Sequence, residues 1–180
     1  MNLWNRSGNV HTAHQVAGFF EQTCRGLPRA LKFRRVLADS GFGDNGFLEH
    51  LESEGFRYVV AMRLSDCVKA AIRQVAAWTA VAPGIEIAEA RVRLSTWGRP
   101  RRMVFVRQHV PTRPRATGKQ PTLFEDLEDH RDCRYGAMAT NEEDLPMLEV
   151  WRTYRPRAKI ENVIKELKEG YGWHEFNVRS

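Results

Sequence analysis

Residues 57–63, Arg-Tyr-Val-Val-Ala-Met-Arg, are the feature of this sequence that most restricts its fold. The apolar run at their centre has no polar alternation, which is typical of a strand that is buried on both faces. A strand of this kind lies in a sheet that helices cover. The run therefore predicts an α/β protein built around a central sheet.

Signals before this strand predict a helix, a strand and a second helix. Residues 15–25 predict a short helix, and residues 33–38 predict a strand that leads into Asp39. Asp44 can cap a helix over about residues 45–54. We expect this helix to bury Phe47, Leu48 and Leu51 and to end at Gly55.

Signals after this strand change from helical to extended. Ser65 can cap a helix that runs to about Trp78, so strands and helices alternate up to this point, as in a right-handed crossover. Residues 80–141 then hold short extended runs and a loop rich in proline and arginine. We expect residues 80–141 to form a β-rich insertion between two portions of the core, 1–79 and 142–180.

The composition suits a soluble protein with a polyanionic partner. No apolar run is long enough to cross a bilayer, and the three cysteines are far apart, which argues against a disulfide framework. The formal net charge is +6, and such an excess favours polyanions only weakly. The basic residues gather in two stretches, each of which can equally be a solvated face: 99–119 and 152–168.

A final helix, predicted from about Pro156 to Glu169, carries a spaced group of polar residues. The offsets of three, four and seven residues would place one carboxylate, two cations and a phenol along the same side of a helix. Carboxylate oxygens are preferred ligands of Mg²⁺, and arginine and lysine bind DNA phosphates. An ordinary amphipathic helix with an Arg–Glu pair explains the spacing equally well. The residues of the group are Tyr154, Arg157, Glu161 and Lys168.

Three blocks of sequence and a short segment near residue 6 together resemble one family. The spacing Tyr154-x2-Arg157-x3-Glu161-x6-Lys168 is similar to the Tyr-Arg-Glu-Lys signature of bacterial insertion-sequence DDE transposases. The segment that starts at Asp39, Asp-Ser-Gly-Phe, resembles the family's second acidic motif. Residues 135–141, which end in Thr-Asn, resemble the strand that precedes the family's glutamate helix, and residues 6–11 resemble its Gly-Asn segment.

This resemblance implies an RNase H-like core, incomplete here, with a β-rich insertion. It makes Asp39 and Glu161 the second and third catalytic acids and ligands of Mg²⁺ or Mn²⁺. It makes Tyr154, Arg157 and Lys168 contacts to DNA phosphates. It implies that the partners are transposon ends and target DNA, that the chain can form a homodimer, and that it works in the bacterial cytoplasm near the nucleoid, without a membrane.

The resemblance also exposes a gap at the first catalytic acid. Glu21 is the one carboxylate among residues 1–38, and it stands in a helix-like stretch outside the family's motif. We therefore expect a transposase fragment that cannot cut DNA alone. A non-catalytic DNA-binding protein or regulator built on the same fragment is the first alternative.

A second alternative is a nucleotide-binding α/β protein. Residues 41–46, Gly-Phe-Gly-Asp-Asn-Gly, match the dinucleotide pattern between a strand and a helix. Asp39 and Asp44 would repel a pyrophosphate there, and the next strand ends in Arg63 where an acid is usual. The tryptophans are expected to be core or interface residues more than base-stacking platforms: Trp78, Trp97, Trp151 and Trp173.

Overall fold

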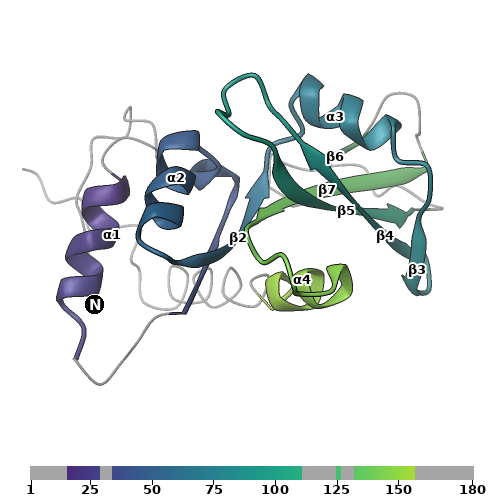
Figure 1. The fold of residues 1–180 in the computed structure, drawn as a ribbon. Coiled ribbons are helices and arrows are strands. Elements are labelled where there is room, and N and C mark those ends of the chain that lie inside the picture. Colours follow the sequence, from purple (N-terminus) through teal and green to yellow (C-terminus); the bar gives the residue numbers. More distant parts are fainter. Residues whose placement is uncertain (1–15, 29–33, 111–124, 127–131, 157–180) are drawn as a thin grey trace, which may run out of the picture.

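The computed structural model describes residues 16–28, 34–110, 125–126 and 132–156 (Figure 1). Within these ranges the strands form one seven-stranded sheet in the order β1-β2-β7-β5-β4-β3, with β6 also paired to β7. The strands are β1 Arg35–Ala38, β2 Arg57–Met62, β3 Thr79–Ala82, β4 Ile85–Val92, β5 Arg101–His109, β6 Glu125–Asp126 and β7 Cys133–Thr140. The helices are α1 Val16–Arg25, α2 Asn45–Ser53, α3 Asp66–Arg73 and α4 Met147–Tyr154, with a 3-10 turn η1 at Ser40–Phe42.

The sheet is mixed. β1 and β2 run parallel, with Val36 opposite Tyr58, and the chain between them holds α2. Every other strand pair is antiparallel. The strands of the expected 80–141 insertion continue this sheet, because β7 pairs with β2 over residues 137–140 and β5 pairs with β7. The domain division itself stays a prediction.

Helices cover both faces of the sheet, and this confirms the prediction made from residues 57–63. Tyr58, Val60 and Met62 point into the cluster under α1, α2 and α3, whereas Val59 and Ala61 point into the cluster under α4. Figure 1 shows α3 and α4 on opposite sides of the strands. The structure is thus a mixed α/β protein, and its RNase H-like character stays a prediction.

Helix α2 forms as its sequence predicts. Its N-cap residue is Asp44, whose carboxylate accepts hydrogen bonds from the N–H groups of Gly46 and Phe47 at 2.9 and 3.3 Å. A free carboxylate at this end also interacts favourably with the helix dipole. Phe47, Leu48 and Leu51 are buried. The chain turns away after the helix at Gly55, whose φ of 74° is accessible to glycine at little cost.

Two helices differ from the prediction. Helix α3 ends at Arg73 and not at Trp78, because Trp78 leaves the helical path and packs its ring edge-on to Tyr135 of the sheet. Helix α4, Met147–Tyr154, was not predicted at all. Tyr154 therefore lies in the last turn of α4, not at the start of a later helix. The helix predicted over 156–169 lies outside the described residues.

No helix among the described residues has the length and apolar character that crossing a membrane requires.

Candidate functional site

Asp39 stands where the sequence predicts it, at the end of β1. It is the N-cap of the 3-10 turn η1, and its carboxylate accepts a hydrogen bond from the N–H of Gly41 at 2.9 Å. Its backbone is extended, and the side chain is half-buried. The turn therefore holds one carboxylate at the carboxyl end of a parallel strand, the edge of an α/β sheet at which ligands commonly bind.

The glycines after Asp39 have structural explanations. A Cβ added to Gly43 would lie 2.9 Å from the sulfur of Met62, so this glycine lets the turn pass close to β2. The N–H groups at the start of α2 donate to Asp44. An anion would have to displace that carboxylate, so the loop offers no support for the dinucleotide alternative.

The other predicted site residues lie mostly outside the described part of the chain. Arg157, Glu161 and Lys168 all fall beyond residue 156. Tyr154 is described: its ring is 6% exposed and packs in the cluster beneath the sheet. The structure thus places Asp39 and Tyr154, and a meeting of Asp39 with Glu161 stays a prediction.

The described residues do not by themselves make a metal site. Over the ranges that the structure describes, no group of three or more histidine, cysteine, aspartate or glutamate residues could hold an ion. Asp39 supplies one carboxylate, while Mg²⁺ needs several oxygen ligands. A complete site would therefore require ligands from elsewhere, and Glu161 is the predicted one.

The Thr-Asn pair of the third block ties two strands together. Thr140 donates its hydroxyl to the carbonyl of Tyr58 at 2.7 Å. The Asn141 amide donates to the carbonyl of Phe56 at 2.8 Å and accepts from the N–H of Tyr58 at 2.9 Å. These bonds satisfy backbone groups where β2 begins, so the pair fixes the register of β7 beside β2. That structural role was not foreseen from the sequence.

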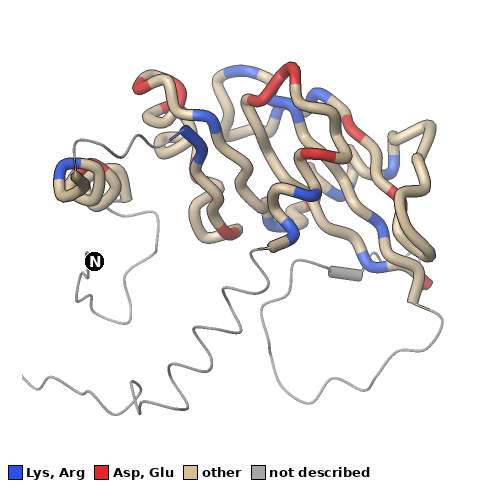
Figure 2. Tube along the Cα trace, turned by 90° about the horizontal axis from the view of Figure 1, so that it is seen from below, with Lys and Arg blue, Asp and Glu red and all other residues tan. Residues whose placement is uncertain are grey.

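The described part of the 99–119 basic stretch is paired with acids and is not an open cationic face. Figure 2 shows basic and acidic residues interspersed along the described chain. Arg102 binds Glu89 with a 2.5 Å contact, and Arg107 binds Glu86 at the same distance. Arg99 and Arg101 both bind Glu52. Charge neutralised in this way adds little to the attraction of a polyanion.

Glu52 is the centre of a buried network between α2, β2 and β5. Arg101 donates to both of its oxygens, at 2.9 and 3.0 Å, and the hydroxyl of Tyr58 donates at 2.8 Å. Burial alone would raise the pKa of Glu52, but hydrogen bonds from Arg101, Arg99 and Tyr58 outweigh it and lower this pKa to about 2. Burial, with the bond to Glu52, raises the pKa of Tyr58. The carboxylate therefore stays charged and structural, and it is unsuited to proton transfer.

Glu21, the one acid before Asp39, is engaged elsewhere. In α1 it forms a 3.3 Å ion pair with Arg25, and it lies 3.8 Å from Nε2 of His50 on α2. Arg25 is one turn along the same helix, and His50 is the neighbour that Glu21 has on α2. Its position gives no reason to assign it the role of a first catalytic acid.

A mixed sheet between helices, with an aspartate held at the end of a parallel strand, is compatible with the fold of DDE transposases. The model of the family described as Transposase DDE domain matches residues 5–180, nearly the whole chain. The chain therefore belongs to the transposase DDE domain family. No curated protein matches the chain significantly.

Proposed function

We propose that this chain is the part of a DDE transposase that carries the second and third catalytic acids, Asp39 and Glu161. The parent reaction would be cleavage and transfer of DNA strands at the ends of an insertion sequence. The observation that carries the proposal is the family match over residues 5–180. The position of Asp39 at the end of β1 supports it.

In this proposal each predicted residue has one task. Asp39 and Glu161 would hold a divalent ion, Mg²⁺ or Mn²⁺, as domains of this family generally do. When bound, the ion would supply Lewis-acid stabilisation of the scissile phosphate. Arg157 and Lys168 would neutralise and orient the DNA backbone. Tyr154 is 6% exposed in the cluster under the sheet, so its hydroxyl would reach a phosphate only at the surface of that cluster.

The proposal includes inactivity of this chain on its own. Asp39 and Glu161 are two acids of a three-acid site, and Glu21, the one carboxylate before Asp39, lies on α1 outside the family's acidic motif. Two carboxylates alone complete the coordination of a metal pair poorly. The Tyr-Arg-Glu-Lys group, a bacterial cytoplasmic setting, homodimer formation and the binding of transposon ends and target DNA also belong to the proposal.

Two assays on the purified chain test this function. One follows nicking of supercoiled plasmid with Mg²⁺ or Mn²⁺, and the other follows anisotropy of a labelled duplex between about 50 and 200 mM salt. We expect salt-dependent binding and no metal-dependent nicking. The double variant Arg157→Ala/Lys168→Ala should weaken binding. The charge-matched control Lys69→Ala/Arg91→Ala should weaken it much less.

The outcomes separate the two parts of the proposal. Nicking that Asp39→Ala abolishes would show that the chain is active alone, and would support the role of Asp39. Absence of duplex binding even at low salt would overturn the DNA-directed function. Equal loss of binding in the two double variants would remove Arg157 and Lys168 from the contact surface and favour non-specific attraction by a non-catalytic DNA-binding protein.

A further inference from the structure

Strand β1 forms one edge of the described sheet. Among the described strands it pairs only with β2, and the strand order of the sheet ends at β1. Leu37, in this strand, is 38% exposed, and it is the one large apolar side chain that is exposed within the described ranges. A strand edge that carries an exposed apolar side chain is a template for pairing with another strand.

The backbone of β1 turns alternate residues toward this edge. The carbonyl of Arg34 accepts a hydrogen bond from the N–H of Arg57 on β2 at 3.3 Å. The N–H and C=O groups of one residue in a strand point to the same side, and neighbouring residues alternate. Arg34 and Val36 therefore face β2, whereas Arg35 and Leu37 direct their N–H and C=O groups away from β2.

Three side chains follow one another along one face of β1 and the residue after it: Arg35, Leu37 and Asp39. Side chains two residues apart in a strand point to the same face, and the backbone of Asp39 is still extended. Val36 and Ala38, which lie between them, pack into the cluster on the opposite face. The order along the first face is cation, apolar group, anion. Under a twofold rotation about Leu37, this order is complementary to itself.

This charge pattern selects one register for two copies of β1 that lie side by side. In a twofold antiparallel pair centred on Leu37, the two copies of Leu37 exchange both backbone hydrogen bonds. Arg35 of each copy then lies opposite Asp39 of the other, and opposite charges directly across a strand pair stabilise it. A pair centred on Val36 would place Arg35 opposite Leu37 and would lose this match of charges.

The two charged groups can enter such a pair while they keep their contacts within the chain. Glu142 binds Nε of Arg35, whose side chain is 35% exposed and whose guanidinium carries further N–H donors. The Asp39 carboxylate accepts a hydrogen bond from the N–H of Gly41, and a carboxylate accepts several hydrogen bonds at once. The pairing of two copies therefore requires no internal contact to break.

The opposite edge of the sheet, β3, is less suited to such pairing. Its register with β4 shifts between Ala80 and Ala82, and irregularities of this kind discourage the pairing of edge strands. The sequence of β3, Thr-Ala-Val-Ala, has no charged residue that could select a register.

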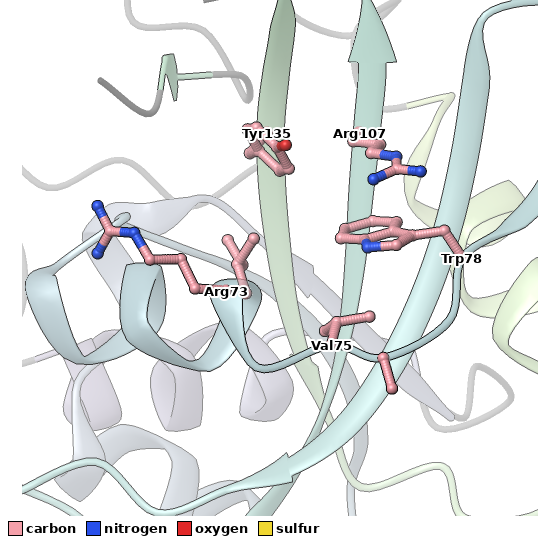
Figure 3. A pocket seen from close by; sticks show the side chains of 7 residues that line it. Arg73, Val75, Trp78, Arg107 and Tyr135 are labelled. Atoms are coloured by element: carbon pink, nitrogen blue, oxygen red, sulfur yellow. The ribbon is translucent and has the colours of Figure 1, made fainter. Parts of the chain in front are cut away.

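The hollow of about 350 Å³ between α3 and the strands β5 and β7 also offers little to a charged partner. Arg107 lies over the ring of Trp78 there (Figure 3), and Glu86 neutralises its charge within the chain. The edge of β1 is therefore the surface that we assign to a partner.

We propose that two copies of this chain associate through β1, in an antiparallel strand pair centred on Leu37 that joins the two sheets into one. The second copy contributes Arg35 beside Asp39, at the predicted acidic site. The inference deepens the proposed function, because it gives the homodimer of that function its interface, and it rests on that function only for the expectation of a dimer.

Charge reversal on the full chain tests the register. Sedimentation velocity over a concentration series measures the association of the wild type, Arg35→Glu, Asp39→Lys, and an equimolar mixture of these two variants. Leu37→Lys places a charge at the centre of the pair. Thr79→Lys, which places the same charge on an exposed residue of the β3 edge, is the matched control.

We expect the wild type to form a dimer. Arg35→Glu and Asp39→Lys should each raise its dissociation constant by about fivefold or more, because two attractive cross-strand pairs become repulsive. The mixture of the two variants should associate at least as well as the wild type, since a mixed pair sets an acid opposite a base at both ends. Leu37→Lys should weaken association, and Thr79→Lys should change it by less than about twofold.

A disulfide offers a second measurement that does not depend on the charged variants. Residues that exchange both hydrogen bonds in an antiparallel pair have Cα atoms about 5.5 Å apart, within the range of about 4.4–6.8 Å that a disulfide spans. Under mild oxidation, Leu37→Cys should therefore give more covalent dimer than the wild type and than Thr79→Cys. This comparison decides if circular dichroism shows the charge-reversed variants to be unfolded.

Three results would overturn the interface: a wild type that is monomeric at its highest soluble concentration, folded charge-reversed variants whose mixture stays monomeric, or no more covalent dimer from Leu37→Cys than from Thr79→Cys. A monomer that still binds duplex DNA leaves the DNA-directed function standing. A dimer that binds no duplex defeats that function and leaves the interface standing.

Discussion

Glu52 accepts hydrogen bonds from Tyr58, Arg101 and Arg99 while its side chain is only 9% exposed. Arg101, 3% exposed, also donates to Asn45 at 2.9 Å and lies over the ring of Trp97. Two buried opposite charges offset each other's desolvation only while both are present. Substitution of either Glu52 or Arg101 should therefore lower the stability of the folded chain strongly.

Glu52→Gln should lower the free energy of unfolding by about 3–5 kcal/mol, because it leaves the buried Arg101 charge without a counter-ion. Urea denaturation followed by circular dichroism measures this change. The control is Glu149→Gln, which breaks the exposed pair with Arg152 and should cost at most about 1 kcal/mol. Equal effects of the two substitutions would contradict the buried network.

The same pair gives the wild type an acid-sensitive stability that the Glu52→Gln variant should lack. The pKa of Glu52 is lowered from 4.5 to about 2 in the folded chain, so the unfolded chain binds the proton more readily. Its contribution to stability is therefore complete above about pH 4.5 and is lost as the pH falls toward 2. Denaturation curves across this window should show a steeper loss in the wild type than in the variant.

The interaction partners of individual side chains were harder to predict from the sequence than the helices and strands. The sequence places Arg99, Arg101 and Arg102 in a basic run, which is equally typical of a DNA-binding face. Glu52 lies 49 residues before Arg101 and meets it only where α2 packs beside β5, whereas Glu89 is 13 residues before Arg102 on the neighbouring strand β4. The position of Asp39 was easier to predict, because it depends only on the strand and the turn next to it in the sequence.

At the scale of elements, α2 and α3 differ in how they begin. Asp44 caps α2 through its side chain, whereas Ser65 occupies the N-cap of α3 without a side-chain cap hydrogen bond. Both helices pack buried residues against the same cluster, including Leu48 and Val68. The contrast isolates what a capping bond contributes in this fold.

Asp44→Ala should lower the free energy of unfolding by about 1 kcal/mol, within the 0.5–2 kcal/mol that capping residues contribute. Ser65→Ala should change it by clearly less, since no side-chain cap bond is lost. Thermal or urea unfolding of the two variants side by side provides the comparison. A larger loss for Ser65→Ala would show that the described caps do not determine helix stability here.

Elements could be predicted where local signals agree and not where tertiary contacts decide. The cap, the apolar spacing and Gly55 all indicate α2, and the structure confirms it. The residues after Arg73 are compatible with a longer helix, yet the contact of Trp78 with Tyr135 draws them to the sheet. Helix α4 has a local signal in its sequence, a proline at its N-cap followed by apolar residues at helical spacing.

At the scale of the whole molecule, one sheet links two apolar clusters. The strands expected as an insertion share the sheet with β1 and β2, and their side chains contribute to both clusters: Phe105 to one and Val104 to the other. The strands β2, β5 and β7 contribute side chains to both clusters. If these strands separated on one face of the sheet, the cluster on the other face would be exposed as well. The two portions of the described chain should therefore unfold together.

We expect a single urea transition with the same midpoint by far-ultraviolet circular dichroism and by tryptophan fluorescence. Circular dichroism follows all elements, whereas the fluorescence reports on the surroundings of the five tryptophans, of which Trp97 lies within residues 80–141. Coincident curves would fit the shared sheet. Two separate midpoints would instead support residues 80–141 as an independently folding insertion.

The pairing of β2 with β7 also governs how the chain can be made. Val60 lies opposite Ala139, so one edge of the most apolar strand receives its partner only after roughly 80 further residues have been synthesised. At about 5–20 residues per second, that interval lasts about 4–16 s on the ribosome. Throughout this interval, one edge of an apolar strand has no partner strand. Nascent chains of this protein should therefore depend on chaperones that bind during translation, and rare codons between residues 62 and 133 should lower its soluble yield.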